Sequence, residues 1–228
     1  MTPNDIIVDA KRLAQDNDLF RTPDSYSAAT LLGFVQQVLK QTVVIRPDLF
    51  TLMTDITPQA ETAEQVLPAD SMRLVSILAV KNGNAITEVS REMMDRSYPQ
   101  WRTDPAGAPV NYMRHIVNPN RYFLYPSPIA GTVLTGEYVQ TPPTYTLNQS
   151  IALLPDGFQS TMVSGVVMMI AAVENDSNDT VASGASRPNY VGRFKQFQEI
   201  FLQSLGANLQ GRNITDTRTS GLEPKEVI

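Results

Sequence analysis

Apolar residues recur at helical spacing in two segments near the N-terminus. A first helix is predicted to begin at Pro3, with Thr2 as its N-cap and Asp5 near the positive end of the helix dipole. Its apolar face comprises Ile6, Ile7, Ala10, Leu13 and Ala14. A second helix is predicted between a cap at Thr22-Pro23-Asp24-Ser25 and a stop at Arg46-Pro47. Its inward face should comprise Ala28, Leu31, Leu32, Val35, Val38, Leu39 and Val43, with Thr42 at its margin. The two segments together predict an antiparallel helical hairpin.

The centre of the chain changes to a pattern typical of β structure. Residues 48–70 are mixed and polar, and we expect a long connection there with at most short strands. Met72–Val80 and Ala85–Val89 flank Asn82-Gly83, a dipeptide favoured in type I′ hairpin turns because both central residues take positive φ. A short helix is expected over Glu92–Asp95. The loop 97–109, rich in Pro and Gly, carries the only tryptophan, Trp101.

A second hairpin is predicted from 111–117 to 121–125 across Asn118-Pro119-Asn120, and Thr132–Gln140 adds a third strand. Alternate residues of a strand point to opposite faces. The strand 121–125 is apolar on both faces, which carry Tyr122 with Leu124 and Phe123 with Tyr125. We therefore expect both faces to be covered.

Two more helices are predicted towards the C-terminus. The third runs from about Phe158 to Glu174, and its inward residues are Phe158, Met162, Val166, Ile170 and Val173. Gly165 in its middle costs about 1 kcal/mol relative to alanine, which indicates a close helix approach. Residues 175–186 form either a polar loop or a frayed extension. The fourth helix begins at Pro188 and ends at Gly206, with a stripe of Tyr190, Phe194, Phe197, Phe201 and Leu205.

These patterns predict an α+β fold. A four-helix body, two helices from each end of the chain, would comprise residues 1–70 and 142–208, with an antiparallel β subdomain inserted at 71–141. With 228 residues, 42% of them hydrophobic and 18% charged, the chain can bury a sizeable core.

An extended C-terminal tail is predicted over residues 209–228. Its first part, 210–221, is polar and aperiodic, and Leu222, Val227 and Ile228 then supply apolar anchors. A free tail is one interpretation. We favour the other, in which the tail orders on a neighbouring subunit or a partner.

Charge and composition exclude several classes of protein. The net charge of −5 argues against a sequence-independent DNA binder, which would be basic enough to neutralise phosphates. The chain has no cysteine, so disulfides, thiolate nucleophiles and Cys-based metal sites are absent. Neither a secretory signal nor an apolar run long enough for a membrane span is apparent, so we expect a soluble protein.

Candidate chemistry is sparse. The single histidine, His115, lies in a predicted strand and is expected to be a sheet-surface side chain, which leaves no Ser-His-Asp set and no His cluster for zinc. Glu88, Glu92 and Asp95 could in principle make a glycosidase-like acid/base pair. Asp176–Asp179 weakly resembles a cation loop but lacks the glycine and glutamate of an EF-hand. We expect no enzyme activity, cofactor or metal, and we expect Trp101 to plug the edge of a core or an interface.

Seven short segments, in this order, resemble the head-to-tail adaptor family of tailed bacteriophages, similar to the tail tubular A protein of T7-like phages. They are Asp9-Ala10 to Asp16 with Arg21; Leu32 to Val38 with Arg46-Pro47; Leu67 to Leu74; Pro99-Gln100-Trp101 with Asn111-Tyr112; Phe123 to Pro128; Glu137-Tyr138; and Leu154-Pro155-Asp156. The resemblance covers residues 2 to about 208. The chain departs from the family pattern at 175–188, and the tail beyond Leu209 lies outside the resemblance.

The resemblance implies a structural virion protein at the head-tail junction. It implies a homo-oligomeric ring of twelve copies beneath the portal protein, which extends the DNA channel without binding DNA specifically and docks the tail nozzle or tail tube. In such a ring the tail docks on the portal through Arg212, Ile214, Arg218, Leu222, Val227 and Ile228. Subunit or tail contacts are expected at Trp101, Arg102, Asn82, Gly83, Asn118 and Asn120.

Two alternatives remain at this stage. One is another neck or tail component, such as a head-completion plug or a tail-tube protein. The other is a tail-associated cell-wall hydrolase acting through Glu88 or Glu92.

Overall fold

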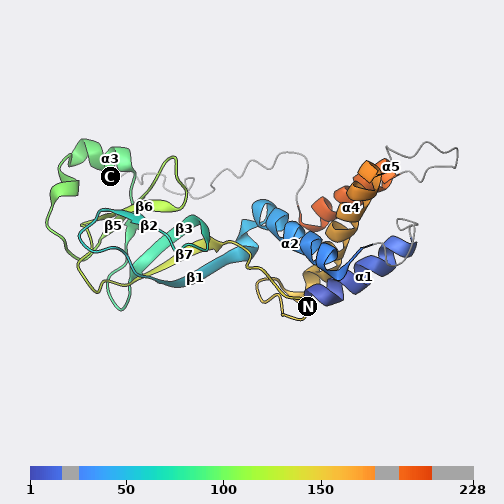
Figure 1. The fold of residues 1–228 in the computed structure, drawn as a ribbon. Helices are drawn as coiled ribbons and strands as arrows, with labels where there is room; N and C mark the ends of the chain where they lie inside the picture. Colours follow the sequence, from blue (N-terminus) through green and yellow to red (C-terminus); the bar gives the residue numbers. More distant parts are fainter. Residues whose placement is uncertain (17–25, 178–189, 207–228) are drawn as a thin grey trace, which may run out of the picture.

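The computed structural model describes residues 1–16, 26–177 and 190–206. The molecule is elongated, with α1, α2, α4 and α5 at one end and the β-sheets at the other (Figure 1). We call the first part the helical body (α1, α2, α4 and α5) and the second the β unit (β1–β7 with α3). The predicted α+β class is confirmed.

The N-terminal helices form as predicted. In α1 (Pro3–Asp16), Thr2 Oγ1 accepts from the Asp5 amide at 3.2 Å, while Asp5 accepts from the Thr2 amide at 2.8 Å. This reciprocal pair satisfies two amides at the helix end.

In α2 (Ala28–Ile45), the N-cap is Ser27, whose Oγ accepts from the Thr30 amide. The predicted cap at 22–25 lies outside the described residues. Ala28 was wrongly expected to face inwards: it is exposed at the start of α2, before Leu31, the first buried residue of the helix.

The C-terminal helices complete the helical body. A short 3-10 turn, η3 (Asp156–Phe158), leads into α4 (Gln159–Ser177), and α5 (Tyr190–Ser204) follows. Gly206, with a φ of +70°, ends α5 as predicted. Residues 178–189, and with them the predicted start at Pro188, lie outside the described part. Val173 was wrongly placed in the core: it is 39% exposed, beyond Ala171, the last buried position in the part of α4 whose side chains are described.

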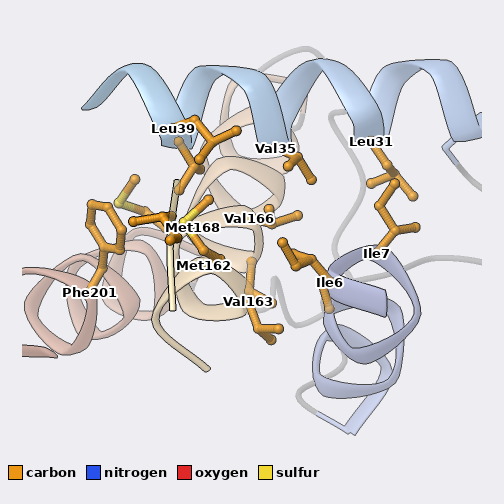
Figure 2. Packing of buried hydrophobic residues seen from close by; sticks show 14 of the residues in the cluster. Ile6, Ile7, Leu31, Val35, Leu39, Met162, Val163, Val166, Met168 and Phe201 are labelled. Atoms are coloured by element: carbon orange, nitrogen blue, oxygen red, sulfur yellow. The ribbon is translucent and has the colours of Figure 1, made fainter. Parts of the chain in front are cut away.

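The core of the helical body lies where α1, α2 and α5 meet α4 (Figure 2). A Cβ built on Gly165 would lie 2.6 Å from Val38 Cγ1 and 3.0 Å from Phe201 Cε2, so the predicted close approach is confirmed. The apolar stretches 28–45 and 156–173 reach a mean hydropathy of 1.3, enough in length and composition for a membrane span. Their packing against one another in this core accounts for that composition equally well.

The β unit contains two sheets. The first has the order β1-β7-β3, with β1 (Thr51–Ile56), β7 (Leu134–Gln140) and β3 (Ser71–Val80) all antiparallel. The second has the order β2-β6-β5-β4, with β2 (Glu64–Val66), β6 (Arg121–Tyr125), β5 (Asn111–Arg114) and β4 (Thr87–Glu88). The β5–β6 hairpin and the helix α3 (Arg91–Ser97) confirm two predictions.

Three predictions about the β unit were wrong. The connection 48–70 contains β1, a strand of six residues that pairs along its whole length with β7. The hairpin predicted across Asn82-Gly83 has only one antiparallel bridge, between Ala79 and Ala85. Strand β4 pairs in parallel with β5 instead. Asn82 has a φ of +58° but Gly83 does not have a positive φ, so the turn is not type I′.

The third wrong prediction concerns 132–140, which was expected to extend the second hairpin. This segment forms β7, the central strand of the other sheet. Gly136 allows the close packing there, since a Cβ would lie 2.9 Å from Ile56 Cδ1 and 3.0 Å from Ile77 Cδ1.

Each face of the second sheet is covered, as predicted. Tyr122 and Leu124 of β6 pack between the two sheets, in a core shared with Ile77 and Tyr138. Phe123 lies on the opposite face in a smaller core with Trp101 and Met113. The β unit is therefore layered as sheet, core, sheet and a covering segment that contains α3.

Candidate interaction surfaces

A segment from Ser90 to Asp104 covers the outer face of the second sheet, at the end of the molecule away from the helices (Figure 1). We call it the α3–η2 segment, since it contains α3 and the 3-10 turn η2 (Trp101–Thr103). Trp101 is 1% exposed, its ring lies edge-on to Phe123 with centroids 5.8 Å apart, and its Nε1 donates to Asp95 Oδ1 at 2.9 Å. The indole therefore anchors the segment from inside.

Charged groups fix the outer side of this segment. Arg102 stacks over the Trp101 ring at 4.9 Å, and Arg91 over the Phe123 ring at 5.4 Å. The hydrogen bond from Trp101 lowers the pKa of Asp95, and the charges of Arg102 and Arg91 lower it further. The segment thus has a fixed shape with an exposed outer surface, on which Met93 is 62% exposed.

The predicted contact residues are distributed over three turns. Asn82 and Gly83 are exposed at the end of β3, and Arg102 is exposed on η2. Asn118 and Asn120 are half-buried, and their carbonyls accept from the amides of Arg121 and Leu67. Partner contacts at these turns stay a prediction. The buried Trp101 lies beneath Arg102 and would support a contact at that side chain.

Glu88 lies in a hydrogen-bonded cluster that joins the two sheets. Its carboxylate accepts from Tyr112 Oη at 2.6 Å and from Arg114 Nε at 2.7 Å. Arg114 also donates to the carbonyls of Leu74 and Val75 in β3. Burial alone would raise the pKa of Glu88, but the hydrogen bonds from Arg114 and Tyr112 outweigh it and hold this pKa below its usual range. Burial and the bond to Glu88 raise the pKa of Tyr112 to about 12.

Acid should weaken this cluster. A carboxylate whose pKa is lowered by folding stabilises the native state above its unfolded pKa, near 4.5, and loses that contribution as the pH falls through its folded pKa. We expect Glu88→Gln to lower the melting temperature at pH 7, and the gap from wild type to shrink towards pH 3. Glu92→Gln, at an exposed position in the first turn of α3, is the matched control. An equal gap at both pH values would contradict this assignment.

Of the candidate catalytic residues, Glu88 and Asp95 both have a lowered pKa, which is the opposite of what a general acid needs. Glu88 and Glu92 line one open cavity of about 400 Å³ together with Arg91 and Arg114. Glu88 is held ionised by Arg114, whereas a general acid would need a raised pKa. Within the described residues, no group of three His, Asp or Glu side chains could hold a metal ion. Of the proposed cation loop, Asp176 is the penultimate residue of α4, and Asp179 lies outside the described residues.

His115 has a structural environment just beyond the end of β5. Its ring stacks on Phe123 with centroids 5.7 Å apart, and its Nδ1 accepts from the amides of Val117 and Asn118 at 3.2 and 3.0 Å. The predicted strand 111–117 is therefore too long. Strand β5 ends at Arg114, and the chain that follows forms a turn in which His115 Nδ1 accepts from the amides of Val117 and Asn118.

The helical body carries an open apolar groove of about 720 Å³ between α2 and α5, with α4 as its floor. We call it the α2–α5 groove. Its residues include Lys40, Val44, Met168, Met169, Phe194 and Leu202. Val44 is 70% exposed at its edge. A methionine-rich apolar surface adapts readily to a partner.

Sequence reasoning missed both Arg114 and the α2–α5 groove. The sequence does contain a signal that could have indicated the role of Arg114. Tyr112 and Arg114 are two residues apart in a predicted strand, so their side chains lie on the same face and can bind the same group. No comparable signal marks the groove, since it depends on how α5 packs beside α2.

Comparison with known proteins identifies the family. A family model described as SU10 adaptor protein matches residues 1–221. No curated protein matches the chain. The match continues past residue 208, so the expectation that the resemblance ends there was wrong. The chain belongs to the SU10 adaptor protein family, and it is a structural component of the bacteriophage head-to-tail junction.

Proposed function

We propose that this adaptor forms a ring of twelve copies beneath the portal protein and docks the tail nozzle or tail tube on its other side. The observation that carries the proposal is the family match over nearly the whole chain. The elongated shape supports it, since helices and sheets lie at opposite ends and could face different partners (Figure 1). Heterologous contacts that close on themselves are the simplest way to make such a ring.

In this proposal the chain works as a helical body, an inserted β unit and a tail. The tail, 209–228, docks on the portal through Arg212, Ile214, Arg218, Leu222, Val227 and Ile228, which lie outside the described residues. The β unit presents the α3–η2 segment and the turns at Asn82-Gly83 and 118–120. It begins at Thr51, because β1 belongs to its first sheet. The net charge of −5 suits a channel through which DNA passes without binding.

The test is reconstitution with the cognate portal. We expect a complex of fixed stoichiometry by native mass spectrometry, with adaptor density beneath the portal by cryo-electron microscopy. Deleting residues 211–228 should weaken the complex. A truncated chain that docks as well as the full chain would overturn the tail assignment, and density elsewhere in the particle would favour a plug or tube protein.

A further inference from the structure

The turn that follows strand β5 presents two apolar side chains to solvent. Ile116 is 74% exposed and Val117 is 85% exposed, and among the described residues no other large apolar side chain is as exposed as these two. Side chains in this position do little to fix the backbone that carries them. The shape of the turn therefore depends on polar contacts.

His115 supplies these contacts. The amides of Val117 and Asn118, two and three residues ahead, both donate to its Nδ1. The oxygen of an Asn or Asp side chain makes the same contacts in an Asx-turn. A ring nitrogen of histidine can accept only when it carries no proton, so the turn requires a neutral imidazole with its proton on Nε2.

The chain beyond this turn is held independently of His115. The carbonyls of Pro119 and Asn120 accept from the amides of Leu74 and Leu67, at 2.9 Å in each case. Loss of the two hydrogen bonds to the imidazole would therefore release the backbone around Ile116 and Val117 and leave residues 119–120 in place.

A proton on His115 would meet a cation on the neighbouring strand. Arg121 of β6 lies across from His115, whose amide donates to the Arg121 carbonyl at 3.3 Å. Like charges in such cross-strand positions are unfavourable. The nearby carboxylate is Glu64 of β2, which is already paired with Arg121 at 2.8 Å. The hydrogen bond from Arg121 lowers the pKa of Glu64, and a positive charge on His115 would lower it further.

The α3–η2 segment adds two more cations beside the ring. Arg91 and Arg102 lie over the ring of Phe123, on which the imidazole of His115 stacks, and both arginines pair with Asp95. The stacking itself survives protonation, since an aromatic face attracts a cation. Protonation would thus keep the imidazole on Phe123 while the turn loses its two hydrogen bonds.

We propose that His115 is a proton-sensitive clamp on the turn 115–118. The neutral imidazole holds Ile116 and Val117 outwards in one arrangement, and a proton on Nδ1 removes both hydrogen bonds and opens the turn. Histidine is suited to this role because its charge ordinarily changes between about pH 5 and pH 8.

The clamp has a consequence for assembly. The turn leads into Asn118 and Asn120, which the proposed function gives to a partner contact, so acid should weaken that contact by disordering its apolar edge. This consequence rests on the proposed function, whereas the clamp is a property of the single chain and is tested there.

Nuclear magnetic resonance of the full chain tests the clamp. His115 is the only histidine, so every imidazole signal belongs to it. The ring nitrogens should show the Nε2–H form when the ring is neutral. Once the ring is protonated, the amides of Val117 and Asn118 should exchange with solvent about tenfold faster relative to their intrinsic rates. The amide of Leu67, which donates to Asn120, should keep its protection.

His115→Asn is the matched variant. The Oδ1 of asparagine is as many bonds from the backbone as Nδ1 of histidine and accepts from the same amides, but it does not titrate. This variant should keep both amides protected in acid. His115→Gln, whose oxygen lies one bond further out, should leave them unprotected at every pH. Circular dichroism confirms that both variants fold.

Three results would each overturn the clamp. They are an Nδ1–H form of the neutral ring, equal protection of the two amides above and below the titration of the ring, and the same loss of protection in His115→Asn as in wild type. None of these results bears on the proposed ring of adaptor copies. Failure of the copies to assemble would overturn the ring and leave the clamp intact.

Discussion

Replacing Gly165 with leucine is expected to destabilise the protein by about 3 kcal/mol, the upper part of the range for overpacked cores. The Cβ alone would lie 2.6 Å from Val38 Cγ1, and both Val38 and Phe201 are almost completely buried. Neither neighbour can move without displacing α2 or α5 from α4. Gly165→Ala should cost less, about 1–2 kcal/mol, since alanine recovers up to about 1 kcal/mol of helix propensity. Urea denaturation followed by circular dichroism measures both changes.

Gly33 provides the matched control in α2. A Cβ at this position would have no atom within 4 Å, so Gly33→Ala should stabilise the protein by up to about 1 kcal/mol. Opposite signs at Gly33 and Gly165 are the expected result. An increase in stability from Gly165→Ala comparable to that from Gly33→Ala would show that the helices do not approach closely there.

The second large effect is expected at Trp101. Removing a buried tryptophan side chain typically costs about 3–5 kcal/mol, and Trp101→Ala would also leave Phe123 and Met113 without their cover. The α3–η2 segment should then detach, because its buried anchor is gone. Limited trypsin digestion should show new cleavage at Arg91, Arg96 or Arg102.

Trp101→Phe separates packing from hydrogen bonding. Phenylalanine keeps an aromatic ring against Phe123 but loses the donor to Asp95, so we expect a smaller loss of stability and a tryptic pattern close to that of wild type. An unchanged pattern in Trp101→Ala would mean that other contacts hold the segment. The fluorescence of Trp101, the only tryptophan, reports on this site in the wild-type protein.

The helices were predictable because their signals are local. Apolar residues at a period of 3.6 define the buried faces of α1, α2 and α5. Helix α4 is buried on all sides from residue 161 to residue 168, and its close approach at Gly165 was correctly predicted. Errors at Ala28 and Val173 lie at or near helix ends, where a periodic pattern continues but the neighbouring helices no longer cover it.

The sheets were harder to predict because their pairing is non-local. Strand β1 carries Thr51, Thr54 and Asp55, and its pairing partner β7 lies far along the chain, so no neighbouring segment reveals it. Asn82-Gly83 gave a strong local signal that tertiary pairing overrode, since β4 pairs with β5 and not with β3. The candidate interaction surfaces depend on the same non-local packing. Trp101 was expected at the edge of a core or of an interface, and it lies in a core. The α2–α5 groove had no signal in the sequence.

The connection between the two parts of the molecule has a mechanical consequence. Phe50, just before β1, and Val139, near the end of β7, both pack in the core of the helical body, and Thr51 pairs with Val139 where the strands leave it. A force that pulls the β unit away from the helices is therefore carried along two covalent backbones side by side. Twisting is resisted by the ladder between them. The adaptor can thus transmit a force from one end to the other through two paired strands. A linker made of one strand of chain would instead extend or rotate under the same force.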